Sequence, residues 1–218
     1  MYVQDLVDFV RENLLDDTVE PYLWSDDTLA LLAKEAERQA CIRADLLINS
    51  TDYSFDTVKG QAEYQMSNDI IRPMKLTYST GGINVEVFKY NLGKGIALSD
   101  VEGLPYQYEF VDNNTIRIHP TPDGIYHIKV IASIYPPNTS PAEFDIPAQY
   151  HLDLRYYVAG QALLTQDIDA QDTGKAQLLL NKFDEAFGLP KDYKSLQRER
   201  LGANMDTPNS YAKRFGFE

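Results

Sequence analysis

Apolar side chains recur at helical spacing near the start of the chain and again towards its end, and they alternate in between. Over residues 3–14 they follow the i, i+3, i+4, i+7 spacing of a one-faced helix, which the acidic and proline residues of 16–21 end. A second stripe, rich in alanine, runs over residues 29–47. Because small side chains let helix axes approach closely, we expect two packed amphipathic helices in this region.

The second helix opens on the sequence WSDD, in which two carboxylates follow a serine. Ser25 occupies the position of an N-cap, whose hydroxyl accepts from the free first-turn amides. Asp26 and Asp27 then lie in the first turn, where the helix dipole favours negative charge. Adjacent side chains on a helix point about 100° apart, so these two cannot share a metal ion or a proton. We therefore interpret the pair as a helix start. The opposite face of the helix is expected to be solvated and carries Lys34, Glu37, Arg38 and Asp45.

Alternation with period two replaces the helical spacing from about residue 57. Six predicted strands, separated by turn residues, cover residues 58–66, 74–79, 83–90, 106–111, 115–120 and 125–135. The last two are predicted to pair as a hairpin, because Pro122 suits a type I turn and Gly124 suits a left-handed bulge. That register places Ile118 opposite Ile128. The Gly-rich residues 91–105 are predicted to form a long exposed loop.

Helical spacing returns at Pro147 and predicts a helix that is apolar on two nearly opposite faces. One face carries Tyr150, Leu154, Tyr157, Val158 and Leu164, and the other carries Leu152, Tyr156, Ala159 and Leu163. A helix of this kind is buried from both sides, either inside a bundle or against a neighbouring subunit. A final helix is expected at about 173–187, with Asp172 capping its start and Gly188 ending it.

The order of these elements predicts an α+β protein, a helical bundle with an antiparallel β domain inserted between N-terminal and C-terminal helices. We expect N-terminal helices over 1–56, the β domain over 57–140 and closing helices over 141–188. Residues 189–218 are expected to form an extended arm. This arm holds six basic and four acidic residues, whereas the whole chain has a net charge of -13.

Composition excludes several classes of protein. A chain this acidic lacks the basic footprint of nucleic-acid binders. No apolar run reaches the roughly 20 residues of a membrane helix, and the first residues do not resemble a signal peptide. The single cysteine, Cys41, lies on the helical pattern and is expected to be a small buried side chain. These features predict a soluble protein made in a reducing cytosol.

Candidate chemistry is sparse in the sequence. The predicted hairpin would set His119 opposite His127 on its outer face, but their neighbours Arg117 and Lys129 are cationic and would repel a metal ion. His151 lies beside Asp153, with no nucleophile placed near it by any motif, and we expect a polar edge residue. The acidic run at 167–172 departs from the calcium-loop pattern. We expect no catalytic residue, no metal site and no cofactor.

The sequence resembles bacteriophage head-to-tail adaptor proteins, in particular those of short-tailed phages of the tail tubular protein A type. The resemblance is carried by W-S-D-D-x-L with L-x-x-E-A-x-R-x-A, by I-x-P-T-P-D-G, and by D-I-P-x-x-Y. Those motifs correspond here to Trp24, Ser25, Asp26, Asp27, Leu29, Leu32, Glu35, Ala36, Arg38 and Ala40, to residues 118–124, and to Asp145, Ile146, Pro147 and Tyr150, with an aromatic at Phe183 in the closing helix.

This resemblance implies a structural virion protein and not an enzyme. It would form a ring, usually twelve-fold, at the head–tail junction, joining the portal protein to a tail nozzle or other tail proteins. DNA would pass through the ring without sequence-specific binding, and the chain would be made in the cytoplasm of a bacterial host. For subunit packing we predict Tyr150, Leu152, Leu154, Tyr156, Tyr157 and Leu163. For an arm that docks to the portal we predict Lys191, Lys194, Arg198, Arg200, Tyr211, Lys213, Arg214, Phe215 and Phe217.

Two other functions remain open at this point. A glycan-binding β-sandwich module with helical flanks would use the strand tyrosines as its platform. A hydrolase would use His151 with nearby acidic residues.

Overall fold

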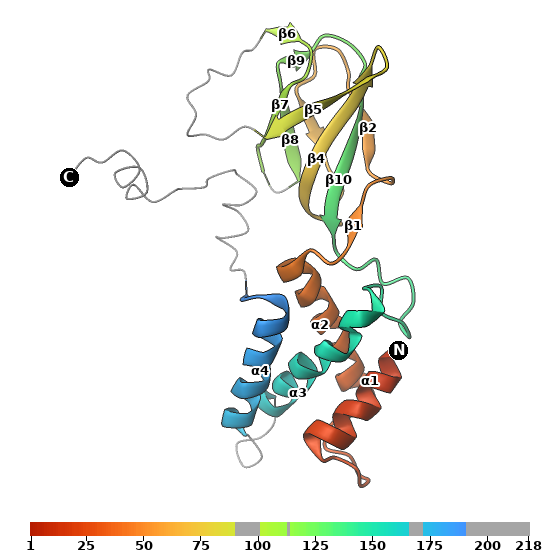
Figure 1. Ribbon diagram of the computed structural model, residues 1–218, viewed down its shortest axis with the longest axis vertical. Helices are drawn as coiled ribbons and strands as arrows, with labels where there is room; N and C mark the ends of the chain where they lie inside the picture. The colour runs from red at the N-terminus through yellow and green to blue at the C-terminus, as the bar shows by residue number, and fades with distance from the viewer. Residues whose placement is uncertain (90–100, 113, 166–171, 191–218) are drawn as a thin grey trace, which may run out of the picture. The chain divides into compact units, whose positions relative to one another are not determined.

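The computed structural model describes residues 1–89, 101–112, 114–165 and 172–190, and these divide into two compact units. The first unit is helical and combines residues 1–48 with the described part of 133–190. The second unit holds the strands and is formed by the described part of 49–132. Figure 1 shows the helices and the strands segregated in this way. The protein is therefore an α+β protein.

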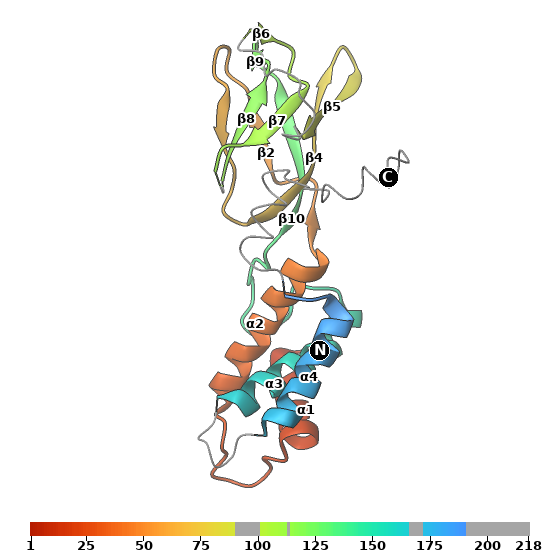
Figure 2. The ribbon, with the colours of Figure 1, turned by 90° about the vertical axis from the view of Figure 1, so that its left-hand side faces the viewer.

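The helical unit is built around α3 (Arg155–Leu164), which packs against α1 (Val3–Val10), α2 (Asp26–Ala44) and α4 (Thr173–Phe187) (Figures 1 and 2). A π-helical turn, η1 (Arg11–Leu15), extends α1, and a 3-10 turn, η2 (Ala148–Leu154), leads into α3. The predicted helix with two apolar faces thus begins as a 3-10 turn and becomes α-helical only at Arg155. Its central position explains why both of its faces are apolar.

Both predicted caps are present. The Ser25 hydroxyl accepts from the Thr28 amide at 3.2 Å, which confirms that the WSDD sequence begins a helix. The Asp172 carboxylate accepts from the Lys175 amide at 2.9 Å and caps α4, which Gly188 ends. Each cap satisfies an amide that has no partner within its helix.

The helices α3 and α4 approach closely at Gly160. A Cβ at this position would lie 2.8 Å from Leu180 Cγ and 3.3 Å from the Ala176 carbonyl oxygen. Phe183 fills the neighbouring space and is fully buried, with its ring 5.1 Å from the ring of Tyr157. The absence of a side chain at Gly160 therefore sets how near these two helices can lie.

The prediction that Glu37 is solvated is wrong, because its side chain is 0% exposed. Its Oε1 accepts from the backbone amides of Asp145 and Ile146, and its Oε2 lies 3.1 Å from Lys34 Nζ. Lys34 in turn donates to the Glu143 carbonyl. The residues that return from the β unit would otherwise have two amides without acceptors, and the buried carboxylate supplies them.

The β unit contains one curled mixed sheet and a short strand pair. Its elements are β1 (Ile48–Asn49), β2 (Ser54–Asp56), β3 (Glu63–Gln65), β4 (Ile70–Thr80), β5 (Ile83–Lys89), β6 (Glu102–Gly103), β7 (Gln107–Phe110), β8 (Thr115–His119), β9 (Thr121–Pro122) and β10 (His127–Ile134). The sheet has the order β1-β10-β4-β5-β7-β8-β3, with β2 also paired to β10, and β6 pairs with β9. Figure 2 shows how strongly these strands curl.

The predicted hairpin of residues 115–135 is not formed. Ile118 lies opposite Tyr108 of β7, and Ile128 lies opposite Phe55 of β2, so the two strands belong to different parts of the sheet. Their apolar faces are real, because Ile118 and Ile128 are both fully buried. A period of two identifies the buried face of a strand but not its partner, which explains the error.

The sheet is also not purely antiparallel as predicted. The pairs β5–β7 and β6–β9 are parallel, the first with Phe88 opposite Gln107. Parallel neighbours need a long connection, and the residues between β5 and β7 supply one. Most of the predicted loop of residues 91–105 lies outside the described residues, but Glu102 and Gly103 form β6 and not part of a loop.

Candidate functional site

The two histidines predicted to face each other lie apart. His119 is buried, and its Nε2 lies 3.1 Å from Glu109 Oε1. His127 is exposed, and its Nδ1 lies 2.7 Å from Asp56 Oδ1. Within the described residues, no group of three His, Cys, Asp or Glu side chains is arranged to hold a metal ion.

His151 is buried and not the polar edge residue that the sequence predicts. Its Nε2 donates to the Ile146 carbonyl oxygen at 2.7 Å, and its ring lies 5.0 Å from that of Phe144. Because a carbonyl oxygen only accepts, this bond places a proton on Nε2. The ring therefore tethers η2 to the preceding segment.

Cys41 is buried in α2 as expected and forms no disulfide. Burial, with smaller contributions from the charges of Glu37 and Asp145, raises the pKa of this thiol to about 12. A thiol with so high a pKa holds little thiolate near neutral pH.

Three of the strand tyrosines that a glycan platform would need are internal. Tyr64, Tyr78 and Tyr108 are all buried in the β unit. Burial raises the pKa of Tyr108 to about 12, with the Glu86 carboxylate adding to the effect. These three rings belong to the core of the unit, whereas Tyr106 is 43% exposed.

The six residues predicted for subunit packing fall into two groups. Leu154 and Leu163 belong to the core of the helical unit, where α3 contacts its neighbours. Tyr150, Tyr156 and Tyr157 are half-buried, and Leu152 is 41% exposed. Only the second group, and Leu152 most of all, can contact another protein.

An apolar loop that the sequence did not indicate stands out between η1 and α2. Within it, Val19 is 78% and Leu23 is 66% exposed, and Tyr22 lies over the guanidinium of Arg11 at 4.0 Å. Exposed aliphatic side chains on a well-held loop are typical of an interaction surface.

Arg11 holds this loop from inside the helical unit. Its guanidinium donates to Asp17 Oδ2 at 2.5 Å, to the Trp24 carbonyl oxygen at 2.9 Å and to Asp26 Oδ1 at 2.6 Å. Asp17 accepts from the amides of Leu23 and Trp24 in addition. The indole of Trp24 donates to the Ala162 carbonyl oxygen of α3 at 3.0 Å. The loop is thus fixed at both ends, and Asp26, which we assigned only to the helix start, also neutralises Arg11.

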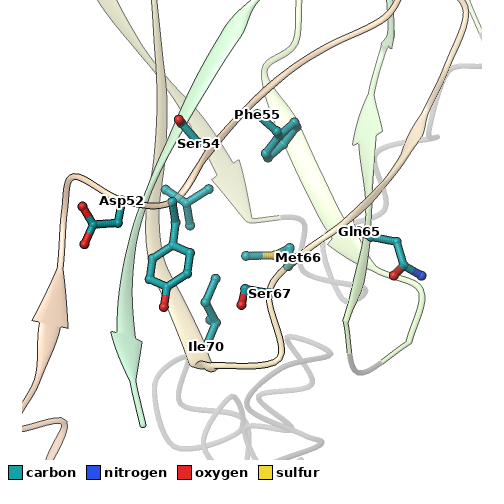
Figure 3. Close-up of a pocket in the computed structure, with 9 residues that line it drawn as sticks. Asp52, Ser54, Phe55, Gln65, Met66, Ser67 and Ile70 are labelled. Carbon is teal, nitrogen blue, oxygen red and sulfur yellow. The ribbon is translucent and has the colours of Figure 1, made fainter. Parts of the chain in front are cut away.

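A pocket of ≈ 150 Å³ lies in the β unit where β2 faces β3 (Figure 3). Figure 3 shows Phe55, Met66 and Ile70 around it, with Asp52 and Gln65 at its two sides. The rings of Phe55 and Tyr64 stack at 5.0 Å across the same region. The pocket exists because, among the described residues, β2 and β3 each lack a partner strand on one side. A period of two along the sequence does not show which strands lack partners, so it could not indicate this pocket.

Some predicted sites lie outside the described residues. These are every residue of the proposed arm from Lys191 to Phe217 and the acidic run at 167–171. In the part of the chain that the structure describes, no helix is long and apolar enough to cross a membrane.

Comparison with known proteins identifies the family. The model of the SU10 adaptor protein family matches residues 1–209, and no curated protein matches the chain. The chain therefore belongs to the SU10 adaptor protein family. It is a bacteriophage adaptor protein, a component of the virion that associates with other phage head and tail proteins. The resemblance of the sequence to phage adaptors is confirmed at this level.

Proposed function

We propose that this member of the SU10 adaptor protein family forms a ring at the head–tail junction, joins the portal to the tail or nozzle and lines the DNA channel. The family match over residues 1–209 carries the proposal. The role is structural, without a reaction or a cofactor, and of the kind that tail tubular protein A fills in short-tailed phages.

The loop of residues 16–24 is our candidate for the contact between neighbouring copies. Binding costs less when the contacting groups are already ordered, and Arg11 and Trp24 hold this loop in place. Val19 and Leu23 then present apolar area at little cost in loop entropy. Leu152 and the half-buried tyrosines predicted for subunit packing, Tyr150, Tyr156 and Tyr157, would extend the same kind of contact over the helical unit.

Net charge supports the role of the channel wall. Twelve copies would together carry 12 × -13 = -156 charges. A wall of this sign repels the phosphate backbone, so DNA can move through without sticking. Replacing acidic residues that face the channel with lysine should slow ejection of the genome, and unchanged ejection kinetics would contradict this part of the proposal.

The basic arm is our candidate for docking to the portal. A segment with few apolar residues cannot form a core of its own and can become ordered on a partner. The proposed contacts are those of the prediction, namely Lys191, Lys194, Arg198, Arg200, Tyr211, Lys213, Arg214, Phe215 and Phe217. Deleting residues 203–218 should abolish binding to the portal, and binding that survives the deletion would remove this role.

Co-sedimentation with the portal protein of the same genome tests the main proposal. We expect the purified chain to join the portal in a fixed ring stoichiometry. The Leu23→Asp variant should reduce the stoichiometry, because it places a charge in the loop contact. The matched control is Ile125→Asp, since Ile125 is 78% exposed in the β unit. No binding of the unchanged chain would contradict the adaptor role.

A further inference from the structure

The curled sheet of the β unit is not closed, because β2 and β3 each have only one strand partner among the described residues. β2 pairs with β10, and β3 pairs with β8. The two edges lie near each other, since the rings of Phe55 and Tyr64 stack at 5.0 Å and the pocket is lined from both strands. We call the region between these two edges the seam.

The hydrogen bonds of β2 show which backbone groups point into the seam. The Val130 amide donates to the Tyr53 carbonyl at 2.9 Å, and the Thr57 amide donates to the Tyr126 carbonyl at 3.0 Å. In an antiparallel pair, the residues that bond to the partner alternate with residues that face away. The N–H and C=O groups of Ser54 and Asp56 therefore face the seam.

The same reasoning applies to β3. The Ile118 amide donates to the Ala62 carbonyl at 2.8 Å, and the Met66 amide donates to the Asn114 carbonyl at 2.7 Å. Residues 63 and 65 therefore point their backbone groups into the seam from the other side. The Glu63 carbonyl already accepts from Gln61 Nε2 at 2.8 Å, which leaves the Glu63 amide and both groups of Gln65 facing the seam.

An extended peptide can bind to such edges by adding a strand, with its main chain giving affinity and pockets for alternate side chains giving specificity. The seam has one such pocket, of ≈ 150 Å³, with Phe55, Met66 and Ile70 among its apolar walls. An apolar cavity of about this size accepts one benzene ring. The seam is thus suited to a short strand with an aromatic side chain that points inward.

The last residues of this chain have that pattern. Residues 213–218 read KRFGFE. In an extended strand, Lys213, Phe215 and Phe217 would share one face, and Arg214, Gly216 and Glu218 would share the other. The six residues 213–218 are enough to pair along β2 and β3, which have three residues each.

Charge and chain length also fit. The outer side of the seam carries the exposed carboxylates of Asp52, Asp56 and Glu63, and Arg214 brings opposite charge to that side. The Asp56 carboxylate lies 2.7 Å from His127 Nδ1, and Glu63 pairs with Arg117. Asp52 instead accepts hydrogen bonds from the side chains of Asn49 and Thr51. Twenty-two residues separate Pro190 from Lys213. At about 3.3 Å per residue they span up to roughly 75 Å when extended.

We propose that residues 213–218 of this chain bind in the seam of its own β unit as an added strand between β2 and β3, with the ring of Phe215 or Phe217 in the pocket. The added strand closes the sheet and covers edges that would otherwise be open to pairing with other chains. It shares Lys213, Arg214, Phe215 and Phe217 with the portal-docking arm, so the portal and the seam compete for this segment.

Amide hydrogen exchange in the intact chain, measured residue by residue without the portal, tests the proposal. We expect the amides of Ser54, Asp56 and Gln65 to be protected. The double variant Phe215→Ala with Phe217→Ala should exchange at these amides at least ten times faster. The control is Leu201→Ala with Met205→Ala, which removes apolar groups upstream and should leave the exchange unchanged.

Two further measurements separate the seam from general loosening of the β unit. Adding a peptide of residues 209–218 to the double variant should restore protection, whereas a scrambled peptide should not. The Ser67→Trp variant, which fills the pocket, should lose protection although the rest of the sheet stays protected, and Ser67→Ala should not.

Three outcomes would overturn the proposal. Equal exchange in the unchanged chain and the double variant would show that the seam is empty. Equal loss in the control variant would show that the terminal aromatics are not the ligand. Protection that rises with protein concentration would show that a second copy supplies the strand. Because the portal is absent from these measurements, each outcome leaves the adaptor function untouched.

Discussion

The helical unit and the β unit satisfy their polar groups in different ways. The helical unit buries charges and pairs them, as Arg11 does with Asp17 and Asp26, and Glu37 with Lys34 and two backbone amides. The β unit is built from aliphatic and aromatic side chains and leaves strand edges open at the seam. Buried charges demand one geometry, whereas an open edge can accept a partner. We infer that the helical unit has a fixed shape and that the β unit can bind an added strand.

The largest effect is expected when the buried carboxylate of the helical unit is removed. Glu37→Ala leaves the Asp145 and Ile146 amides without an acceptor and Lys34 without its partner. Breaking a buried pair of this kind costs about 3–5 kcal/mol. Chemical denaturation followed by far-ultraviolet circular dichroism measures it.

The matched control for this variant lies two residues away on the same helix. Glu35→Ala removes an exposed carboxylate whose partner Arg38 is also exposed, and such pairs contribute about 0–1 kcal/mol. Equal losses of stability in the two variants would show that the Glu37 bonds do not hold the helical unit together.

In the β unit, the corresponding test is a cavity in the apolar core. Leu76 is fully buried, and Leu76→Ala should lower the free energy of unfolding by about 2–5 kcal/mol. Ile83→Ala is the control, because Ile83 is 68% exposed and its loss should cost little. If Leu76→Ala cost less than 1 kcal/mol, the apolar core would not be the main support of this unit.

A smaller effect is expected at the contact between α3 and α4. Gly160→Ala forces Leu180 to move, and overpacking of this kind costs about 1–3 kcal/mol. Gly174→Ala is the control, since its Cβ would make only an ordinary contact 3.6 Å from Asp172 Oδ1. The double variant Gly160→Ala with Leu180→Ala should be less destabilised than the two single losses combined. Thermal unfolding of the unchanged chain, the two single variants, the double variant and the control checks this, and additive losses would contradict the close contact.

The smallest perturbation is chemical modification of the Cys41 thiol, whose rate reports how often the helical unit opens. Burial raises the pKa of the Cys41 thiol to about 12, so at pH 8 the folded chain holds very little thiolate. Unfolding returns the pKa to its ordinary value, about 8.5, and exposes the sulfur. Reaction with an aromatic disulfide reagent at pH 8 should therefore be at least a hundred times slower in buffer than in denaturant. A fast reaction in buffer would show that α2 opens readily.

How far the sequence predicts this molecule differs between the two units. In the helical unit, the period of 3.6 and the caps at Ser25 and Asp172 identify three of the helices, because both signals are local in sequence. In the β unit six of the strands are found, whereas β1, β2, β6 and β9 are not predicted and Ile118 and Ile128 are wrongly paired. Which strands pair depends on contacts between residues distant in sequence, and a period of two gives no information about those contacts.

The candidate sites follow the same division. A single glutamate such as Glu37 has the sequence signature of its exposed neighbour Glu35, and only the approach of residues 145–146 distinguishes them. The loop at Val19 and the seam were missed for a related reason. Both depend on which side chains and strand edges remain uncovered once the other segments have packed. The sequence signal that was available for the loop is an arginine, Arg11, close to Asp17, Trp24 and Asp26.

The two crossings between the units have an evolutionary consequence. The Ile134 amide donates to the Leu47 carbonyl oxygen at 3.0 Å, so the chain leaves and re-enters the helical unit at neighbouring points. For the helical unit, the segment between Leu47 and Ile134 is equivalent to a long loop whose two ends are held together. Doubling the length of such a loop costs only about 0.6 kcal/mol in closure entropy. The inserted unit could therefore be lengthened, shortened or exchanged between related phages while the helical unit stayed the same.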